Sequence, residues 1–237
     1  MKKVLKMFLG IVAMSVLYSC SKITGHGPIV TETRNVPAFT GVNFDLPGNL
    51  HYTPGATFKV ELSSQQNLLD VIETYVSGND LKIRVKSGVN IKSKEDIDVF
   101  IEAPDLTYLS LGGSGYMEVS QIYKPADLRL AVSGSGRIQI SQLETNLLKA
   151  EISGSGDLQI NNGKSNREQI NISGSGMADF LNFPTDDAVT HTSGSGTIQL
   201  QVNKTLEAYI SGSGVVMYKG NPTVKASVSG SGRVVKL

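Results

Sequence analysis

A four-residue motif, Ser-Gly-Ser-Gly, recurs through the second half of this 237-residue chain and constrains its fold more than any other feature. A variant, Gly-Gly-Ser-Gly, begins at Gly112, and full copies begin at Ser133, Ser153, Ser173, Ser193, Ser211 and Ser229. Consecutive full copies lie 20 residues apart three times and then 18 residues apart twice. Such regular spacing indicates a chain built from similar, stacked units.

The segments between the copies alternate apolar and polar residues, which is typical of strands with one buried side. Residues 137–140 and 148–152 show this pattern in one repeat, with a short turn region between them. A Gly/Ser tract is usually interpreted as a flexible linker. Linkers do not alternate with regularly spaced strand patterns, as these tracts do. The motif therefore indicates corners, where glycine permits positive φ and close approach of backbones. We also expect the corner serines to hydrogen-bond backbone groups that the turn leaves unpaired.

Two strands and two corners in about 18–21 residues fit one coil of a single-stranded parallel β-helix, or β-solenoid. One coil cannot bury enough apolar surface alone, so coils must stack as parallel ladders about 4.8 Å apart. An antiparallel sandwich also has short, regularly spaced strands, but near-identical corners favour the solenoid. The inward positions predicted as core are Ile138, Ile140, Ile152, Leu158, Ile160, Ile172, Ile198, Leu200, Ala208, Ile210, Val216, Val224, Ala226 and Val228.

Residues 37–110 lack the motif but keep strand patterns. These patterns lie at residues 58–62, 81–85 and 97–101. We interpret this region as irregular first coils or a cap, with residues 64–72 as one short helix capped by Ser64. The chain is therefore predicted to be all-β, with an irregular N-terminal β region followed by solenoid repeats over residues 111–237.

The N-terminus has the pattern of a lipoprotein signal peptide over residues 1–19. Lysines precede an apolar stretch at residues 7–17, which is shorter than the roughly 20 residues of a membrane-spanning helix. The following Leu-Tyr-Ser-Cys sequence resembles the bacterial lipobox, in which the cysteine receives a diacylglycerol. Cys20 is the only cysteine, so its lipidation excludes a disulfide. We predict anchoring through Cys20, with residues 20–36 as lipidated cysteine and tether.

Charge and motif spacing argue against several functions. The 22 Lys+Arg and 21 Asp+Glu residues nearly balance and are scattered, which disfavours nucleic acid as a partner. His26, His51 and His191 lack metal-ligand spacing. The corner serines do not fit the Gly-x-Ser-x-Gly motif of serine hydrolases, and the paired glycines lack the third glycine of a dinucleotide-binding motif. We predict no catalytic residue, metal or cofactor.

One enzymatic hypothesis follows from the existence of polysaccharide-degrading β-helices. In stacked coils Asp157 and Asp179 would lie on adjacent rungs about 8 Å apart, within the range of inverting glycosidases. The short turns offer no cleft that would raise a carboxyl pKa or exclude water. Solvated carboxylates are therefore the favoured interpretation.

Two outward rows are better candidates for function. The first contains Glu118, Gln139, Gln159, Asp179, Gln199 and Met217, in which Gln139 and Gln159 would form part of a structural amide ladder. The second contains Ala131, Glu151, Asn171, His191, Tyr209 and Ser227. Within it, Glu151, Asn171, His191 and Tyr209 would form a flat strip of acid, amide, imidazole and phenol. Such groups bind sugar hydroxyls and stack on sugar rings, so we predict a candidate ligand-binding face here, with ordinary surface as the alternative.

Three features together resemble a known family. These are Pro37-Ala38-Phe39-Thr40-Gly41-Val42, Asn67-Leu68-Leu69 ahead of a Gly-Asn-Asp-Leu turn, and the serial corners. They resemble the head GIN domain of auto-transporter adhesins, a family common in Bacteroidetes lipoproteins. The resemblance covers nearly all of the mature chain, implies a β-helical fold and an envelope location, and supplies no binding residues.

The leading hypothesis is a non-enzymatic outer-membrane lipoprotein that presents a flat solenoid face to a glycan or protein. The alternatives are an inward-facing structural protein of the periplasm and a carbohydrate-active enzyme. The last coil would offer an open parallel edge, guarded by Arg233 and Lys236 or paired end to end with a second copy as a homo-oligomer.

Overall fold

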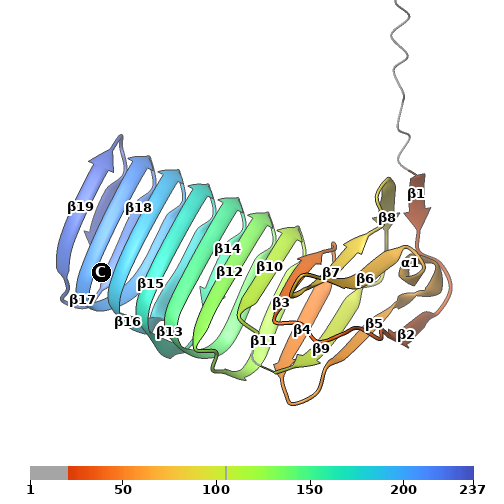
Figure 1. Cartoon of the computed structure of the whole chain (residues 1–237). Helices are drawn as coiled ribbons and strands as arrows, with labels where there is room; N and C mark the ends of the chain where they lie inside the picture. The colour runs from red at the N-terminus through yellow and green to blue at the C-terminus, as the bar shows by residue number, and fades with distance from the viewer. Residues whose placement is uncertain (1–20, 105) are drawn as a thin grey trace, which may run out of the picture.

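The computed structural model describes residues 21–104 and 106–237 and shows a long stack of β-coils with a cap at one end (Figure 1). The predicted all-β solenoid is therefore confirmed. The predicted signal peptide and Cys20 lie outside the described residues. Within the described residues, no helix is both long enough and apolar enough to cross a bilayer.

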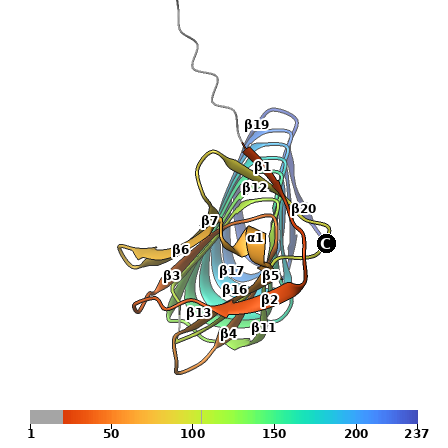
Figure 2. The same cartoon turned by 90° about the vertical axis from the view of Figure 1, so that its right-hand side faces the viewer.

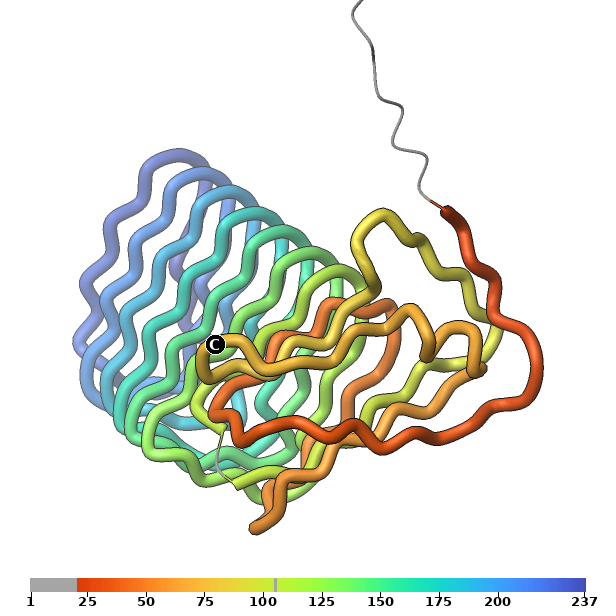
Figure 3. Tube along the Cα trace, turned by 45° about the vertical axis from the view of Figure 1, so that its right-hand side comes forward, coloured from red at the N-terminus to blue at the C-terminus, as the bar shows by residue number. Residues whose placement is uncertain are grey.

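The solenoid has two faces, each a parallel ladder of strands, which we call face A and face B. Along face A lie β7 (Asp80–Val85), β3 (Gly41–Asp45), β10 (Tyr108–Gly113), β12 (Asp127–Gly134), the second half of β13 (Arg137–Gly154), β15 (Gly163–Gly174), the second halves of β16 (Met177–Gly194) and β17 (Thr197–Gly212), and β19 (Thr223–Ser229). Along face B lie β9 (Asp98–Ala103), β4 (Asn49–Pro54), β11 (Tyr116–Tyr123), the first half of β13, β14 (Asp157–Ile160), the first halves of β16 and β17, β18 (Val215–Lys219) and β20 (Arg233–Lys236). Figure 2 shows the coils one behind another, and Figure 3 shows their backbones running parallel.

Strands β13, β16 and β17 pass without interruption from face B to face A. For the first of these repeats the sequence predicts two strands, at residues 137–140 and 148–152. The observed strand instead bends around the second corner, where the chain passes from face B to face A. It keeps its pairing with the neighbouring coils on both faces. Between other coils the pairing around this corner includes register shifts, as between Phe180 and Pro184 of β16.

The Ser-Gly-Ser-Gly motif forms the first corner of each coil, where the chain passes from face A to face B. Its glycines permit positive φ and close approach of backbones, as predicted. Gly154 has φ of +118°, and a Cβ there would lie 2.6 Å from the carbonyl oxygen of Gly134 in the preceding coil. At Gly156 a Cβ would lie 2.4 Å from Cγ1 of Val132. Positive φ and close backbone approach both exclude larger residues here.

The predicted role of the corner serine hydroxyls is wrong. Neighbouring corners satisfy one another through their backbones: the Ser155 amide donates to the Gly134 carbonyl at 2.8 Å, and the Ser175 amide donates to the Gly154 carbonyl at 2.8 Å. Among the described residues, no hydroxyl of a corner serine makes a hydrogen bond. The hydroxyl groups are therefore left for solvent or a ligand.

Antiparallel strands close the N-terminal end of the stack. There β6 (Ile72–Ser77) pairs with β7, β5 (Lys59–Gln65) pairs with β9, and β2 (Ile29–Thr33) pairs with β5. The short helix α1 (Gln66–Leu69) lies across the end of the coil in Figure 2 and buries Leu68 and Leu69. The helix is shorter than the predicted residues 64–72. Ser64 lies in β5 and does not cap it, because Gln65 occupies the N-cap position and makes no capping side-chain bond.

Part of the expected tether is folded onto the domain. β1 (Ser21–Thr24) pairs in parallel with β8 (Val89–Lys92), and β2 belongs to the cap. The expectation of a tether over residues 20–36 is therefore wrong for these two strands, because both pair with other strands of the N-terminal region.

One apolar core runs between the two faces. The predicted core positions from Ile138 to Val216 are all buried. The prediction is wrong for Val224, Ala226 and Val228, which are exposed. These three lie on β19, whose only partner among the described strands is β17, so no further coil covers their inward side.

Candidate ligand-binding groove

Face A carries the outward row that the sequence predicts. The strand register aligns Glu151 with Asn171, Asn171 with His191, and His191 with Tyr209. Ala131 precedes the row on β12, and Ser227 follows it on β19. The order of the row is confirmed, whereas its role in binding stays a prediction.

A row of serines runs beside it, two residues further along each strand and therefore about 6.8 Å away. Register places one serine in each coil, namely Ser133, Ser153, Ser173, Ser193, Ser211 and Ser229. All of them are exposed. We call this set the serine row. The sequence predicts these residues only as corners, although their regular spacing is the signal that could have revealed a second outward row.

The mixed row, together with the serine row from Ser133 to Ser211, lines a groove of about 780 Å³ on face A. It begins at Tyr108 on β10, crosses β12, β13, β15, β16 and β17, and ends at Ser227 on β19. Because β12, β13, β15, β16 and β17 each contribute the same two positions, the groove is elongated along the axis of the solenoid.

Opposite charges pair at the β10 end of the groove. Arg129 donates to the Glu151 carboxylate at 2.8 Å, and its guanidinium carbon lies 5.3 Å from the centroid of the Tyr108 ring. The ion pair is exposed, so it contributes at most about 1 kcal/mol to stability. Its main effect is to cancel charge on this part of the surface.

Aromatic rings occupy the other end. The His191 and Tyr209 rings stack at 4.8 Å with an interplanar angle of 9°. The Tyr209 hydroxyl donates to Glu207 at 2.7 Å, and this hydrogen bond raises the pKa of the Tyr209 phenol above its ordinary value. The facing surfaces of the two rings cover each other, so a ligand reaches their polar edges and outer faces.

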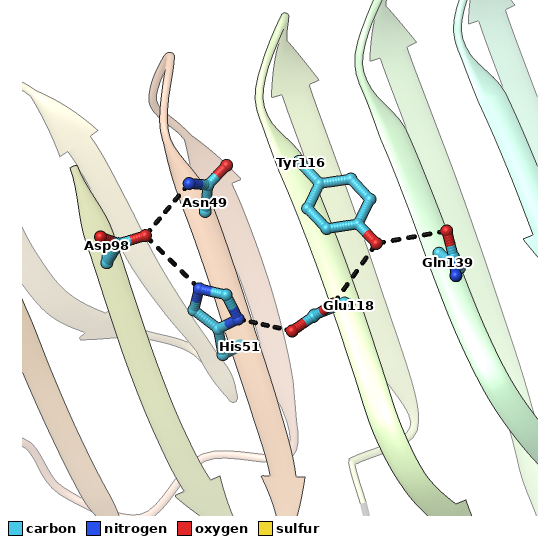
Figure 4. A network of polar contacts seen from close by, with 6 residues as sticks. All are labelled: Asn49, His51, Asp98, Tyr116, Glu118 and Gln139. Atoms are coloured by element: carbon cyan, nitrogen blue, oxygen red, sulfur yellow. Dashed lines mark hydrogen bonds and ion pairs between the residues drawn. The ribbon is translucent and has the colours of Figure 1, made fainter. Parts of the chain in front are cut away.

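Face B carries a polar network near the capped end, shown in Figure 4. It joins side chains from four neighbouring strands, namely Asn49, His51, Asp98, Tyr116, Glu118 and Gln139.

His51 is at the centre of this network. Its Nδ1 lies 2.7 Å from Glu118 Oε1, and its Nε2 lies 3.4 Å from Asp98 Oδ1. Both contacts are hydrogen bonds only when both ring nitrogens carry protons. The three side chains are each about one-third exposed on an open strand face, so we assign the network to holding coils together. No group of three or more His, Cys, Asp or Glu in the described part of the chain is placed to hold a metal ion.

Sequence reasoning missed this network. The predicted outward row contains Glu118 and Gln139, but Asn49, His51 and Asp98 come from the irregular first coils, where no motif fixes the register. His51 and Asp98 are 47 residues apart. The stacking of His51 on Phe100, with ring centroids 4.9 Å apart, depends on the same register.

The two carboxylates of the enzymatic hypothesis lie on face B, on adjacent coils and offset by two residues, as expected. Each already has a local partner. Arg137 donates to Asp157 at 2.8 Å, and the Leu181 amide donates to Asp179 at 3.3 Å. On the same face Gln139 lies beside Gln159, but its side-chain carbonyl accepts from the Tyr116 hydroxyl at 3.2 Å.

Comparison with known proteins gives a family and a fold. A family model described as "Putative auto-transporter adhesin, head GIN domain" matches residues 38–222. No curated protein matches the chain.

Several solved structures are similar, and at their low identities they show the fold alone. A "putative adhesin" from Bacteroides fragilis NCTC 9343 has a TM-score of 0.86 and 21% identity, covering 91% of this chain and 100% of that one. A "putative lipid binding protein" from Parabacteroides distasonis ATCC 8503 has a TM-score of 0.76 and 23% identity, covering 92% and 100%. A "putative adhesin" from Parabacteroides merdae ATCC 43184 has a TM-score of 0.73 and 19% identity, covering 92% and 99%.

Proposed function

This chain belongs to the family of auto-transporter adhesin head GIN domains, and on that premise we propose that it is a non-enzymatic, lipid-anchored binding module of the cell envelope. Its binding surface is the groove on face A, which takes a glycan or protein ligand. The observation that carries the proposal is the pairing of two continuous outward rows along this groove, one of mixed polar groups and one of unbonded hydroxyls.

The position of the first strand supports an anchor at Cys20. β1 begins at Ser21 and pairs with β8 at the capped end of the stack. In Figure 1 this end lies opposite β19. A lipid on Cys20 would therefore hold the capped end near the membrane and leave the coils of the groove accessible to a partner.

The partners of the acidic groups support binding in preference to catalysis. Glu151 is the acid within the groove, and it is paired with Arg129. The stacked His191 ring makes no hydrogen bond to a nucleophile among the described residues. A ligand would meet a preformed, shallow surface on which polar side chains alternate with apolar ones, which suits recognition of an extended partner.

Cell labelling tests the location. We expect an antibody to a C-terminal epitope tag to label intact cells, because the proposed partner is external. Cys20→Ala is the control, since loss of the lipid should move the protein out of the membrane fraction. Labelling that requires permeabilised cells would instead support the inward-facing structural role in the periplasm.

Binding arrays test the surface. We expect the purified domain to bind at least one probe on glycan and protein arrays, and the paired variant Asn171→Ala/His191→Ala to lose that binding. The control pair Gln159→Ala/Gln199→Ala removes side chains of similar size from face B and should leave it unchanged. Equal binding by both pairs would reject face A as the site.

A further inference from the structure

We infer that the ligand of the groove is an uncharged, extended β-1,4-linked glycan that lies along the solenoid axis with one sugar opposite each coil. This inference rests on the proposed function and specifies its ligand. It is drawn from the period, the free hydrogen-bonding groups and the charge of the groove.

The period of the groove matches such a chain. Neighbouring coils lie about 4.8 Å apart, which is close to the length that each sugar adds to an extended β-1,4-linked glycan. The register is unbroken from Glu151 to Tyr209 and from Ser153 to Ser211. The seven strands of the groove span roughly 29 Å, which leaves room for about six sugars. Because successive sugars of a β-1,4-linked chain are turned by about half a turn, every second sugar would present the same edge to the groove.

The hydroxyl groups of the serine row are unused. The serine row presents one exposed hydroxyl per coil, and none of these hydroxyls is bonded within the described chain. The Asn171 amide and the His191 imidazole add donors and acceptors beside Ser173 and Ser193. A row of groups that both donate and accept is suited to sugar hydroxyls, which do the same.

The charge of the groove favours a neutral ligand. Glu151 is paired with Arg129, and the phenol of Tyr209 is an uncharged group that donates its hydrogen bond to Glu207. The central positions Asn171, Ser173 and Ser193 carry no charge. An anionic or cationic polysaccharide would find no matching charge at these three positions.

The sheet geometry favours a glycan over a peptide. Extended peptides bind by adding a strand to a free sheet edge, whereas this groove lies on the face of a sheet whose backbone groups are paired between coils. The ligand must therefore be recognised by side chains alone. Short hydroxyl side chains form a shallow surface that suits a flat sugar chain.

Titration with defined oligosaccharides tests the inference. The probes are cellohexaose, chitohexaose and mannohexaose, with the tetramers of the same series and with α-linked maltohexaose as the linkage control. We expect at least one β-linked hexamer to bind roughly tenfold more tightly than its tetramer, because two further sugars add hydrogen bonds worth about 1.4 kcal/mol in total. Maltohexaose, whose chain is curved, should bind much more weakly.

Serine variants of the same corners provide a matched pair. Ser173→Ala/Ser193→Ala removes two hydroxyls of the serine row, and we expect roughly tenfold weaker binding of the hexamer. Ser175→Ala/Ser195→Ala removes the second serine of the same two corners, outside the groove, and should leave binding unchanged. Thermal melts of both variants check that the fold is intact.

The outcomes separate the inference from the proposed function. Failure of all three β-linked hexamers to bind, equal binding of maltohexaose, or equal effects of the two serine pairs would overturn the inference. If an array ligand of another class still depended on Asn171 and His191, the proposed function would stand. If no array ligand depended on Asn171 and His191, both the inference and the proposed function would be rejected.

Discussion

Glu168 places a carboxyl group in the apolar interior of the solenoid, where it is fully buried. Its register neighbours in adjacent coils are Leu148 and Ala188. The Ser165 hydroxyl donates to Oε1 at 3.2 Å, and Oε2 has no partner within the described chain. Burial raises the pKa of this carboxyl from 4.5 to about 8, so the group is neutral in the folded protein at pH 7.

Glu168 should therefore make stability depend on pH. Below about pH 4.5 the carboxyl is protonated in both the folded and the unfolded chain, so the raised pKa costs nothing. Between about pH 4.5 and 8 the unfolded chain releases the proton while the folded chain keeps it, so stability falls by roughly 5 kcal/mol across this window. Glu168→Gln should remove that fall.

Urea denaturation of both proteins at several pH values measures this effect. All other titrating groups are shared, so the difference between the two pH profiles isolates Glu168. Parallel profiles would show that the carboxyl is solvated or ionised in the folded state. A variant that is also more stable at pH 8 would fit the energetic cost of the partly unbonded carboxyl.

The inward position of Glu168 could be predicted from the sequence. That the folded core accepts a carboxyl group at this position could not. Alternation along the strand puts it on the same side as Ile170 and Ile172, which are both buried. Composition alone argues that an acid belongs outside. The carboxyl can be buried because its raised pKa keeps it neutral and because the Ser165 hydroxyl donates to it. Both conditions depend on packing in three dimensions.

At the scale of the element, the corner is the unit that fixes the fold, and Gly154 tests it. Gly154→Ala must adopt φ of +118° and bring Cβ within 2.6 Å of the Gly134 carbonyl oxygen. We expect a loss of roughly 3 kcal/mol or more in the free energy of unfolding, because unfavourable φ and backbone overlap both contribute.

Two control variants separate these causes. Gly78→Ala has positive φ of +64° with open space around its Cβ and should cost only about 1 kcal/mol. Ser155→Ala, in the same corner as Gly154, removes an exposed hydroxyl and should be nearly neutral. If Gly154→Ala cost no more than Gly78→Ala, close packing of the corners would not be the constraint.

Local sequence patterns predicted strands and corners well in the solenoid, because the repeat fixes which coils each strand lies between. The corners and the order of the outward rows followed from the spacing alone. The signals were weaker in the N-terminal region, where α1 is shorter than predicted and β1 and β2 are paired. Pairing of β1 with β8 depends on sheet edges that only the folded cap creates, and no local pattern reports them.

The candidate site shows the same limit at the scale of the whole molecule. The sequence predicted the row from Glu151 to Tyr209 because stacking follows from the repeat. It did not predict that the His191 and Tyr209 rings cover each other, or that the serine hydroxyls stay unbonded. Both findings depend on side-chain conformations and on backbone bonds between neighbouring corners.

The far end of the solenoid determines how whole molecules can meet. β19 pairs on one side with β17, and β20 pairs on one side with β18. On β19 the inward residues Val224 and Val228 are 37% and 42% exposed. Among the described strands neither has a second partner, and a sheet edge with unpaired backbone groups and apolar side chains is a template for a further strand.

We therefore expect two copies to associate through this edge, since a second copy would cover the inward valines and pair the backbone. Sedimentation velocity over a range of concentrations should show a dimer that dissociates on dilution. Val224→Lys/Val228→Lys should give a monomer, because dimerisation would bury both charges. Thr223→Lys/Ser227→Lys adds the same charges to the outward side of β19 and should still dimerise. A wild-type chain that sediments as a monomer at every concentration would show that water and the flanking Arg233 and Lys236 are sufficient to guard the edge.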